Sequence, residues 1–248
     1  MDNYFNELKI VVLDNAYAKN FMEIHHYTHS CGKCVIAYGI YHHTDLKCVV
    51  AYGYPSGRNL ASSIWEGGNE QECLELIRLF SFDDCPKNME SWCISKSVKC
   101  LKRDLPNIKV LVSYADTGAG HVGYIYQASS WDYIGQGSKE PKIFIDGQRV
   151  HRRSLNGKYG TSSIKKLKEI FGDRLQVDDN RFAKNKYIKI IKDKNKIEKL
   201  LKVKKLPYPK GDIKYYNDTN NEFNSINGMA ITNKKHKEID EQLTFLDI

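Results

Sequence analysis

The stretch from His25 to Cys34, HHYTHSCGKC, holds three histidines and a Cys-x-x-Cys pair. Imidazoles and thiolates at this density can bind zinc, and a Cys-x-x-Cys pair can also do redox chemistry. A structural zinc site needs four ligands in tetrahedral geometry, however, and no second Cys-x-x-Cys or spaced histidine pair follows. A redox pair begins a helix after a strand, whereas Cys31 and Cys34 precede a strand-like run. We therefore interpret both cysteines as ordinary loop residues, with zinc and redox chemistry as the alternatives.

Two further residues of this stretch, His26 and Tyr27, come at the end of a predicted helix. In one interpretation they point into a cleft and take part in chemistry. In the other, His25 and His26 are cations that favourably face a helix C-terminus. The residues alone leave both interpretations open.

A second polar group, from Ser113 to Ser129, follows a short and almost wholly apolar run that is typical of a buried strand. Ligands collect at the C-terminal edge of such strands, beside glycines that let the backbone approach them. Asp116 can serve there as a general base or a metal ligand, and Tyr126 can donate a proton or orient a substrate. The alternative is a helix cap with buried tyrosines that are hydrogen-bonded for packing.

Arg78 is embedded in the apolar run Leu76-Ile-Arg-Leu-Phe80. A buried arginine is rarely without an anionic partner. It either pairs with an acid such as Asp83 or Asp116, or it reaches a phosphate or carboxylate of a ligand.

The elements that must position these groups follow from apolar periodicity. Strands are predicted at 8–13, 35–41, 48–54, 72–82 with a bulge, 109–116, 132–135, 142–146, 149–153 and 186–192. Helices are predicted at 16–25, 89–105, around 122–129 and at 162–171, with a basic helical segment before Pro207. This order predicts a mixed α/β sheet with helices as crossovers.

Composition limits the class of protein. With 41% hydrophobic and 27% charged residues, the 248-residue chain is typical of a soluble globular domain with a tail. No apolar run approaches the roughly 18 residues of a membrane span. The N-terminal MDNYFNELKI lacks the pattern of a secretory signal, so we expect a cytoplasmic protein with seven reduced cysteines.

The net charge of +8 is uneven along the chain. Between Arg181 and Lys210, twelve Lys or Arg face two acids, a local charge of +10 that leaves the remainder near −2. Such a run is either a solvated face or the electrostatic footprint of a protein that binds a phosphate backbone.

Several blocks in one order resemble a known family. They are His26-Tyr27, Glu75-Leu-Ile-Arg78-Leu-Phe, Asn88-Met-Glu-Ser-Trp92, Pro106 to Asp116, Gly120-His-Val-Gly-Tyr-Ile-Tyr-Gln-Ala-Ser129 and His151-Arg-Arg153. With these blocks the chain resembles the Mom family of bacteriophage DNA-modification proteins, within the GNAT acyltransferase superfamily. The combination of SYAD with GHVGYIYQAS is the specific part of the match.

The resemblance implies a GNAT-like fold, with a mixed and mostly antiparallel central sheet, crossover helices and a basic C-terminal extension. We expect a catalytic domain at 1–160, a basic extension at 161–211 packed on it, and a flexible tail at 212–248. The partners it implies are double-stranded DNA and acetyl-coenzyme A, in the cytoplasm of the host cell if a phage encodes the chain.

The activity that the resemblance implies is conversion of adenine in double-stranded DNA to N6-carbamoylmethyladenine, which protects phage DNA from restriction. Acetyl-coenzyme A and iron are the implied cofactors. Carried onto this chain, the catalytic residues would be His26, Tyr27, Arg78, Asp116 and Tyr126. The cofactor contacts would be Arg78, Asn88, Ser113 and Tyr126, and the metal ligands His26, Tyr27 and Asp116. The family's histidine corresponds to either His25 or His26, because the two are adjacent and the residues alone do not decide between them.

One segment departs from the GNAT pattern. Where those enzymes usually have a glycine-rich turn for the coenzyme pyrophosphate, this chain has Asp83-Asp-Cys-Pro-Lys-Asn88. Two acids do not suit a pyrophosphate, although the free N–H groups of the following helix can still bind one.

An enzyme that modifies adenine N6 in a duplex must hold the backbone and extrude the base. The predicted phosphate contacts are Arg152, Arg153, Lys184, Lys186 and Lys189. Trp92 and Trp131 could stack on the extruded base, but we interpret them as core residues. The alternative functions are a GNAT N-acetyltransferase for a protein or small-molecule amine, and a non-catalytic DNA-binding phage protein on the same scaffold.

Overall fold

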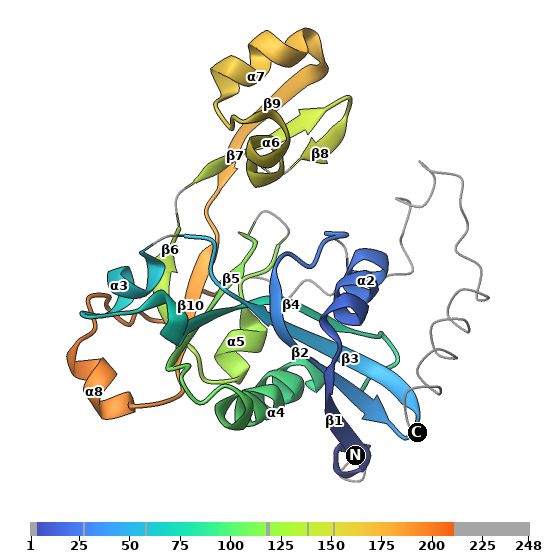
Figure 1. Ribbon diagram of the computed structural model, residues 1–248, viewed down its shortest axis with the longest axis vertical. Coiled ribbons are helices and arrows are strands. Elements are labelled where there is room, and N and C mark those ends of the chain that lie inside the picture. Colours follow the sequence, from blue (N-terminus) through green and yellow to red (C-terminus); the bar gives the residue numbers. More distant parts are fainter. Residues whose placement is uncertain are drawn as a thin grey trace. The chain divides into compact units, whose positions relative to one another are not determined.

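The computed structural model describes residues 4–26, 28–57, 59–117, 120–137, 139–150 and 152–210 (Figure 1). The predicted site residue Tyr27, the histidine of the His151-Arg-Arg153 block and the predicted tail at 212–248 lie outside the described residues.

The main sheet has seven strands in the order β1-β2-β3-β4-β5-β10-β6. Their bounds are β1 Leu8–Leu13, β2 Cys34–His42, β3 Asp45–Gly53, β4 Cys73–Ser81, β5 Val110–Ala115, β6 Asp132–Gln136 and β10 Asn185–Ile190. Every neighbouring pair is antiparallel except β4 and β5, which are parallel. The prediction of a mixed, mostly antiparallel sheet is therefore confirmed.

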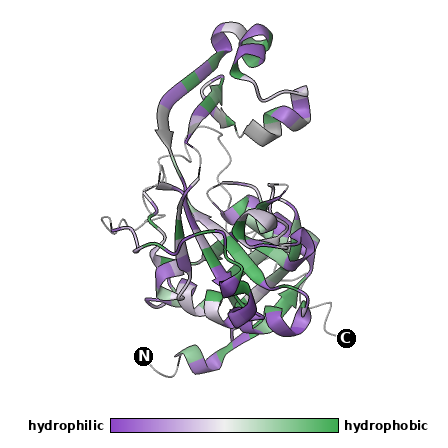
Figure 2. Ribbon diagram, turned by 90° about the vertical axis from the view of Figure 1, so that its left-hand side faces the viewer, coloured by the Kyte–Doolittle hydropathy of each residue, from purple (hydrophilic) through white to green (hydrophobic). Residues whose placement is uncertain are grey.

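Helices lie on both faces of this sheet. Their bounds are α1 Tyr4–Glu7, α2 Asn15–His25, α3 Leu60–Ile64, α4 Met89–Asp104, α5 Tyr124–Ala128 and α8 Lys194–Lys199. The 16-residue α4 buries Met89, Ile94 and Leu101 against one face, and α5 adds Tyr126 to the same core. The opposite face is covered by α2 over β2 to β4 and by α3 and α8 over β5 and β10. Runs of hydrophobic residues follow the strands of this sheet (Figure 2).

Local sequence explains the ends of the two long helices. The Asp14 carboxylate accepts hydrogen bonds from the backbone N–H groups of Ala16 and Tyr17, which have no partner within α2. Pro106 follows the last residues of α4 and cannot continue the helix. None of the described helices has the length and apolar character needed to cross a membrane.

The bulge predicted in the fourth strand is confirmed. Arg78 pairs with Ala51 and Leu76 pairs with Tyr52, so Ile77 is the extra residue of β4. Because of the bulge, Arg78 shares the face of Ala51, which α2 covers, rather than the face of Leu76.

Residues between β6 and β10 form a second, three-stranded sheet with the order β8-β7-β9. Its strands are β7 Glu140–Ile145, β8 Gln148–Val150 and β9 Leu175–Phe182. Two helices, α6 Arg152–Tyr159 and α7 Ile164–Phe171, pack on this sheet and contribute Leu155 and Leu167 to its hydrophobic core. The strand predicted at 149–153 is corrected, since β8 ends at Val150 and Arg152 begins α6. β9 was not predicted, because its segment LQVDDNRF is mostly polar.

The segment predicted as a basic extension, 161–211, does more than pack on a finished domain. Its strand β10 lies within the main sheet, between β5 and β6. The reason is visible in Asn185-Lys-Tyr-Ile-Lys-Ile190, where Tyr187 and Ile188 are fully buried on opposite faces of the sheet.

Candidate active site

A fork between the parallel strands β4 and β5 is the centre of the candidate site. The two strands pair at only three positions, ending with Glu75 opposite Val112. β4 then continues to Ser81 beside β3, and β5 continues to Ala115 beside β10. The ladder therefore stops while both strands run on, and the strands are not paired with each other beyond Glu75 and Val112. A ligand with an extended chain could lie between such separated strands.

Tyr126 and Ser113 lie at the start of this fork, on the face that α4 and α5 cover. The Ser113 hydroxyl is 3.0 Å from the Leu76 carbonyl oxygen and 2.8 Å from the Tyr126 hydroxyl. The Tyr126 ring is buried with its centroid 5.4 Å from Trp131 and 5.2 Å from Tyr187. The tyrosine hydroxyl is thus held at one fixed place where the strands separate.

His26 reaches the opposite face from the end of α2. The residue is extended, its N–H donates to the Met22 carbonyl, and its side chain is buried. The backbone N–H of Thr28 lies 3.1 Å from Nδ1, and the Thr28 hydroxyl lies 2.8 Å from it. Since a backbone N–H can only donate, Nδ1 accepts and the neutral ring carries its proton on Nε2.

The electrostatic surroundings keep His26 neutral. Burial, followed by the charges of Arg78, His29 and His121, lowers the pKa of its imidazole from 6.5 to about 3. His26 is therefore a hydrogen-bond donor at neutral pH, through Nε2–H.

The structure also separates the two adjacent histidines. The His25 ring packs on Phe21, Phe80 and Phe82, with centroid distances of 4.4, 5.6 and 5.6 Å. His26 instead shares its surroundings with Arg78 and His121. This arrangement favours His26 as the functional residue of the pair.

Arg78 extends from the bulge of β4 toward the loop that follows α2. Its Nε donates to the Ser30 carbonyl at 2.5 Å, and Nη1 donates to the Ile77 carbonyl at 2.5 Å. Within the residues that the structure describes, no carboxylate lies within ion-pair distance of its guanidinium, so of the two alternatives for Arg78 the pairing with Asp83 or Asp116 is not observed. Its charge and remaining N–H groups are suited to an anionic ligand.

Asp116 directly follows β5, and its carbonyl oxygen accepts a hydrogen bond from the His121 N–H at 3.0 Å. This turn brings His121 close enough to act on the His26 imidazole. The sequence contains His121 within the GHVGYIYQAS block, but nothing in its spacing singled it out as a site residue.

The other predicted cofactor contact, Asn88, is the N-cap of α4. It has a left-handed backbone with φ of 69° and its side chain does not cap the helix. The preceding turn is less acidic than its sequence indicates, because Lys47 Nζ lies 2.6 Å from Asp84 Oδ2. The Met89 N–H donates to the Pro86 carbonyl at 3.2 Å. The other N–H groups of the first turn of α4 are not capped by Asn88, and a helix N-terminus of this kind can bind an anion.

The described residues do not fit an iron site at His26 and Asp116. A ligating imidazole gives one nitrogen to the metal and donates the other N–H to an acceptor, whereas Nδ1 of His26 faces the N–H of Thr28. In the described part of the chain, no cluster of three His, Cys, Asp or Glu ligand groups includes His26, Asp116, Cys31 or Cys34. No zinc cluster is therefore observed there, and both cysteines have free thiols.

The predicted DNA contacts differ in their surroundings. Lys184 is exposed, whereas burial lowers the pKa of Lys186 and of Lys189. Lys189 Nζ already donates to the Ser129 carbonyl at 2.7 Å and to the Ser130 carbonyl at 3.2 Å. Arg152 and Arg153 begin α6. Of the three lysines, Lys184 is thus the best suited to a phosphate.

The two tryptophans considered for base stacking belong to the core. Trp131 is fully buried beside Tyr126. Trp92 is partly buried, with its ring centroid 5.6 Å from that of Phe5 and Lys96 Nζ 5.0 Å above it. The interpretation as packing residues is confirmed for Trp131.

The sheet order, the single parallel pair at the fork and the helices on both faces define a GNAT-like fold. The sequence places the chain more narrowly. A model of the Mom protein family matches residues 7–210, and the chain belongs to that family. It is 27% identical over 210 residues to methylcarbamoylase mom of Escherichia phage Mu, a match that covers 82% of this chain and 84% of the phage protein.

Three of the solved structures to which the chain is similar are acetyltransferases. The match to SpeG, a spermidine/spermine N-acetyltransferase from Vibrio cholerae, covers 78% of this chain and 98% of the SpeG chain. The sequence identity is 6% and the TM-score is 0.43. The match to an N-acetyltransferase from Staphylococcus aureus Mu50 covers 74% of this chain and 97% of that enzyme's chain. The sequence identity is 11% and the TM-score is 0.37. The match to AAC(6')-Ib in complex with parmomycin and acetyl-CoA covers 53% of this chain and 86% of that enzyme's chain. The sequence identity is 9% and the TM-score is 0.39.

Proposed function

We propose that this protein is a transferase that modifies DNA, converting adenine in double-stranded DNA to N6-carbamoylmethyladenine. The observation that carries the proposal is the family match over residues 7–210, together with a phage relative named methylcarbamoylase. Such a modification would shield phage DNA from restriction endonucleases of the host cell.

Acetyl-coenzyme A is the proposed acyl donor, and the fork fits an extended thioester. A chain laid between the separated ends of β4 and β5 could hydrogen-bond to backbone groups that have no ladder partner there. When bound, the coenzyme would supply a two-carbon unit as a thioester. Tyr126 and Ser113 would hold its reactive end, and the N-terminus of α4 at Asn88 would face its phosphates.

The residues around the fork suit distinct roles in a first acyl transfer, in which adenine N6 bonds to the thioester carbonyl carbon, the C–S bond breaks and coenzyme A leaves as a thiol. The carbamoylmethyl product is bonded through the other carbon and holds one more nitrogen, so its formation would also need a nitrogen donor of the ammonia class and a two-electron oxidant. We assign Asp116 the role of the general base that accepts a proton from adenine N6. His26 cannot take that role at Nε2, where the neutral ring already carries its proton, and instead donates a hydrogen bond to a polarised oxygen. We assign Tyr126 the transfer of a proton to the departing sulfur and Arg78 the binding of an anionic group; both side chains have hydrogen-bond partners at the fork.

Binding of the duplex would rest on the basic residues late in the sequence. Lys184 is exposed beside β10, and Lys194, Lys196 and Lys199 are exposed on α8. Contacts of this type are sensitive to salt, because each one displaces a counterion from DNA. Extruding adenine from the stack would give N6 access to the fork.

Mass spectrometry of nucleosides from bacteria that express the chain tests the function. We expect a deoxyadenosine species heavier by one carbamoylmethyl group, which is absent from cells with empty vector. An acetyl group on a protein or polyamine amine, with unmodified deoxyadenosine, would support an N-acetyltransferase instead. No new modification on DNA, protein or small amines, despite salt-sensitive DNA binding, would indicate a non-catalytic DNA-binding protein.

A further inference from the structure

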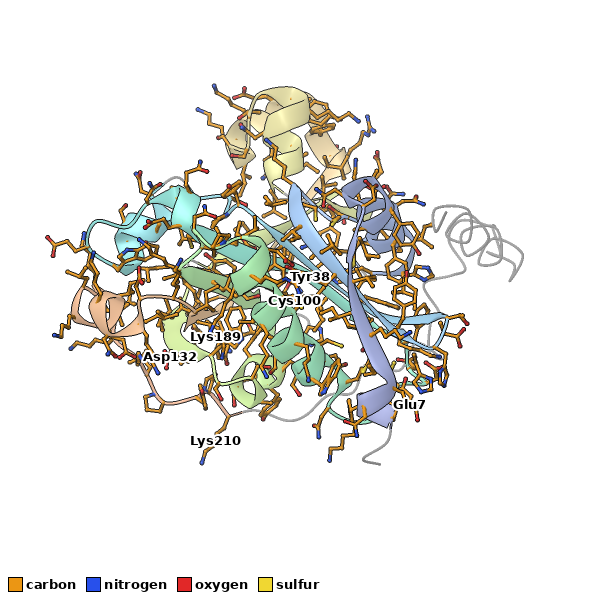
Figure 3. The ribbon with its side chains drawn as sticks, turned by 60° about the horizontal axis from the view of Figure 1, so that its bottom comes forward. Glu7, Tyr38, Cys100, Asp132, Lys189 and Lys210 are labelled. Carbon is orange, nitrogen blue, oxygen red and sulfur yellow. The ribbon has the colours of Figure 1, made fainter. Side chains whose placement is uncertain are left out.

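Outside the fork, Glu7, His42 and His43 bring three metal-ligating groups together. Glu7, labelled in Figure 3, ends α1 directly before β1. His42 is the last residue of β2, and His43 follows it in the turn that leads to β3. His42 Nε2 lies 3.1 Å from Glu7 Oε2, and His43 Nε2 lies 3.4 Å from the same oxygen. The three ligand atoms all lie within 4.8 Å of one another.

The two separations from the Glu7 oxygen match those between ligands of one small divalent ion, and the two histidine nitrogens lie within 4.8 Å of each other. Zinc binds imidazole nitrogen and carboxylate oxygen at about 2.0–2.1 Å, so neighbouring ligands of a tetrahedral zinc are about 3.3–3.4 Å apart. The observed 3.1 and 3.4 Å need only small side-chain movements to admit an ion between the three atoms. Two imidazoles and one carboxylate form a ligand set suited to zinc and to neighbouring transition metals.

Local structure holds the ligands in this arrangement. Leu8, the residue after Glu7, pairs with His42 across β1 and β2, which fixes the register of the two side chains. The Tyr4 ring stacks on His42 with a centroid distance of 4.3 Å and an angle of 19°. His43 has φ of 54°, a left-handed conformation that histidine adopts far less readily than glycine.

We propose that Glu7, His42 and His43 form a binding site for a zinc-class divalent ion, with water in the fourth position. The exposed His43 leaves one side open to that water. Each imidazole must bring an unprotonated Nε2 to the ion, so binding shifts its proton to Nδ1 or releases it, and acid weakens binding. The ion would fasten α1 to the β2–β3 turn.

Fastening α1 has a consequence for the start of α4. Phe5 of α1 packs on Trp92 in the second turn of α4, at 5.6 Å between ring centroids. Lys47, four residues after His43, pairs with Asp84 in the turn that leads into α4. The ion would thus order the segment that packs beside the proposed phosphate-facing end of the fork, although the site itself is independent of the proposed function.

Titration of the chelator-treated full-length protein with Zn²⁺ and with Co²⁺ tests this site. We expect one site per chain, with visible Co²⁺ absorption and no thiolate charge-transfer band. His42→Ala and His43→Ala should each weaken affinity by at least about tenfold, the lower end of what even the loss of an outer-shell partner costs. Glu7→Gln should weaken affinity as well, which guards against a histidine variant that misfolds.

Two matched control variants test whether the loss of metal affinity is specific to the three proposed ligands. His29→Ala and Glu23→Gln change the same residue types elsewhere, since Glu23 lies in α2 and His29 follows that helix. Both variants should bind the ion as the unaltered protein does. No stoichiometric binding would overturn the proposal. Binding with a thiolate band, or binding that survives loss of both His42 and His43, would also overturn it by placing the ion elsewhere.

Discussion

Replacing Tyr126 with Phe removes a hydroxyl that the α5 helix holds at the fork, beside Ser113, and it leaves the ring in position. Stability should change little. The hydroxyl lies 2.8 Å from the Ser113 hydroxyl, and such a buried hydrogen bond contributes about 0.5–1.5 kcal/mol. The ring keeps its packing against Trp131 and Tyr187. In a domain with about 5–15 kcal/mol of stability, this loss leaves essentially all molecules folded.

Activity should change far more than stability. If the Tyr126 hydroxyl gives a proton to the leaving sulfur, its loss should lower the rate by about 10²–10⁴-fold, as for other general acids. The assay is the ratio of modified to unmodified deoxyadenosine at matched protein levels, with urea unfolding of each variant. Tyr133→Phe is the control, because its buried hydroxyl contacts Asn185 Oδ1 at 3.4 Å, away from Ser113. Unchanged product in Tyr126→Phe, or an equal loss in Tyr133→Phe, would refute this role.

Three further predictions concern the other residues of the account. The folded chain holds the pKa of His26 at about 3, below the ordinary 6.5, so the unfolded chain binds this proton more readily. The free energy of unfolding should therefore fall as pH drops from 6.5 toward 3 and level off below; urea unfolding of His26→Gln should show a weaker dependence over that window. Asp116→Ala should abolish the modified nucleoside while circular dichroism and the unfolding midpoint stay near those of the unaltered protein; normal product would remove Asp116 from the mechanism. Changing the exposed Lys184, Lys194, Lys196 and Lys199 to Gln should weaken DNA binding. The slope of log K against log salt concentration should become shallower by about 0.9 for each phosphate that is no longer neutralised. An unaltered slope would make this basic segment a solvated face.

The sequence predicts most of the elements around the fork, because each carries a local signal. Asp14 caps a helix, Pro106 ends one, and the apolar run before Asp116 is a buried strand. A bulge in the strand at 72–82 was also predicted, from an apolar pattern that fits neither period cleanly, and the structure locates it at Ile77. These signals lie within a few residues of the features they determine.

The parts that could not be predicted depend on pairings between distant segments. Nothing local places β10 between β5 and β6, because its neighbours in the sheet come from residues 110–115 and 132–136. The approach of His121 to His26 and the bond of Arg78 to the Ser30 carbonyl likewise join separate loops. The Glu7, His42 and His43 cluster was missed for the same reason, since α1 and the β2–β3 turn meet only through the pairing of β1 with β2.

We propose that the fork holds an acyl thioester whose two-carbon unit goes to adenine in DNA. The most direct measurement adds acetyl-coenzyme A with a heavy-isotope acetyl group, and double-stranded DNA, to an extract of expressing cells, followed by nucleoside mass spectrometry. We predict carbamoylmethyl-deoxyadenosine in which both carbons of the added group carry the label. Modified deoxyadenosine without the label, or label found only on protein or small-molecule amines, would contradict the account.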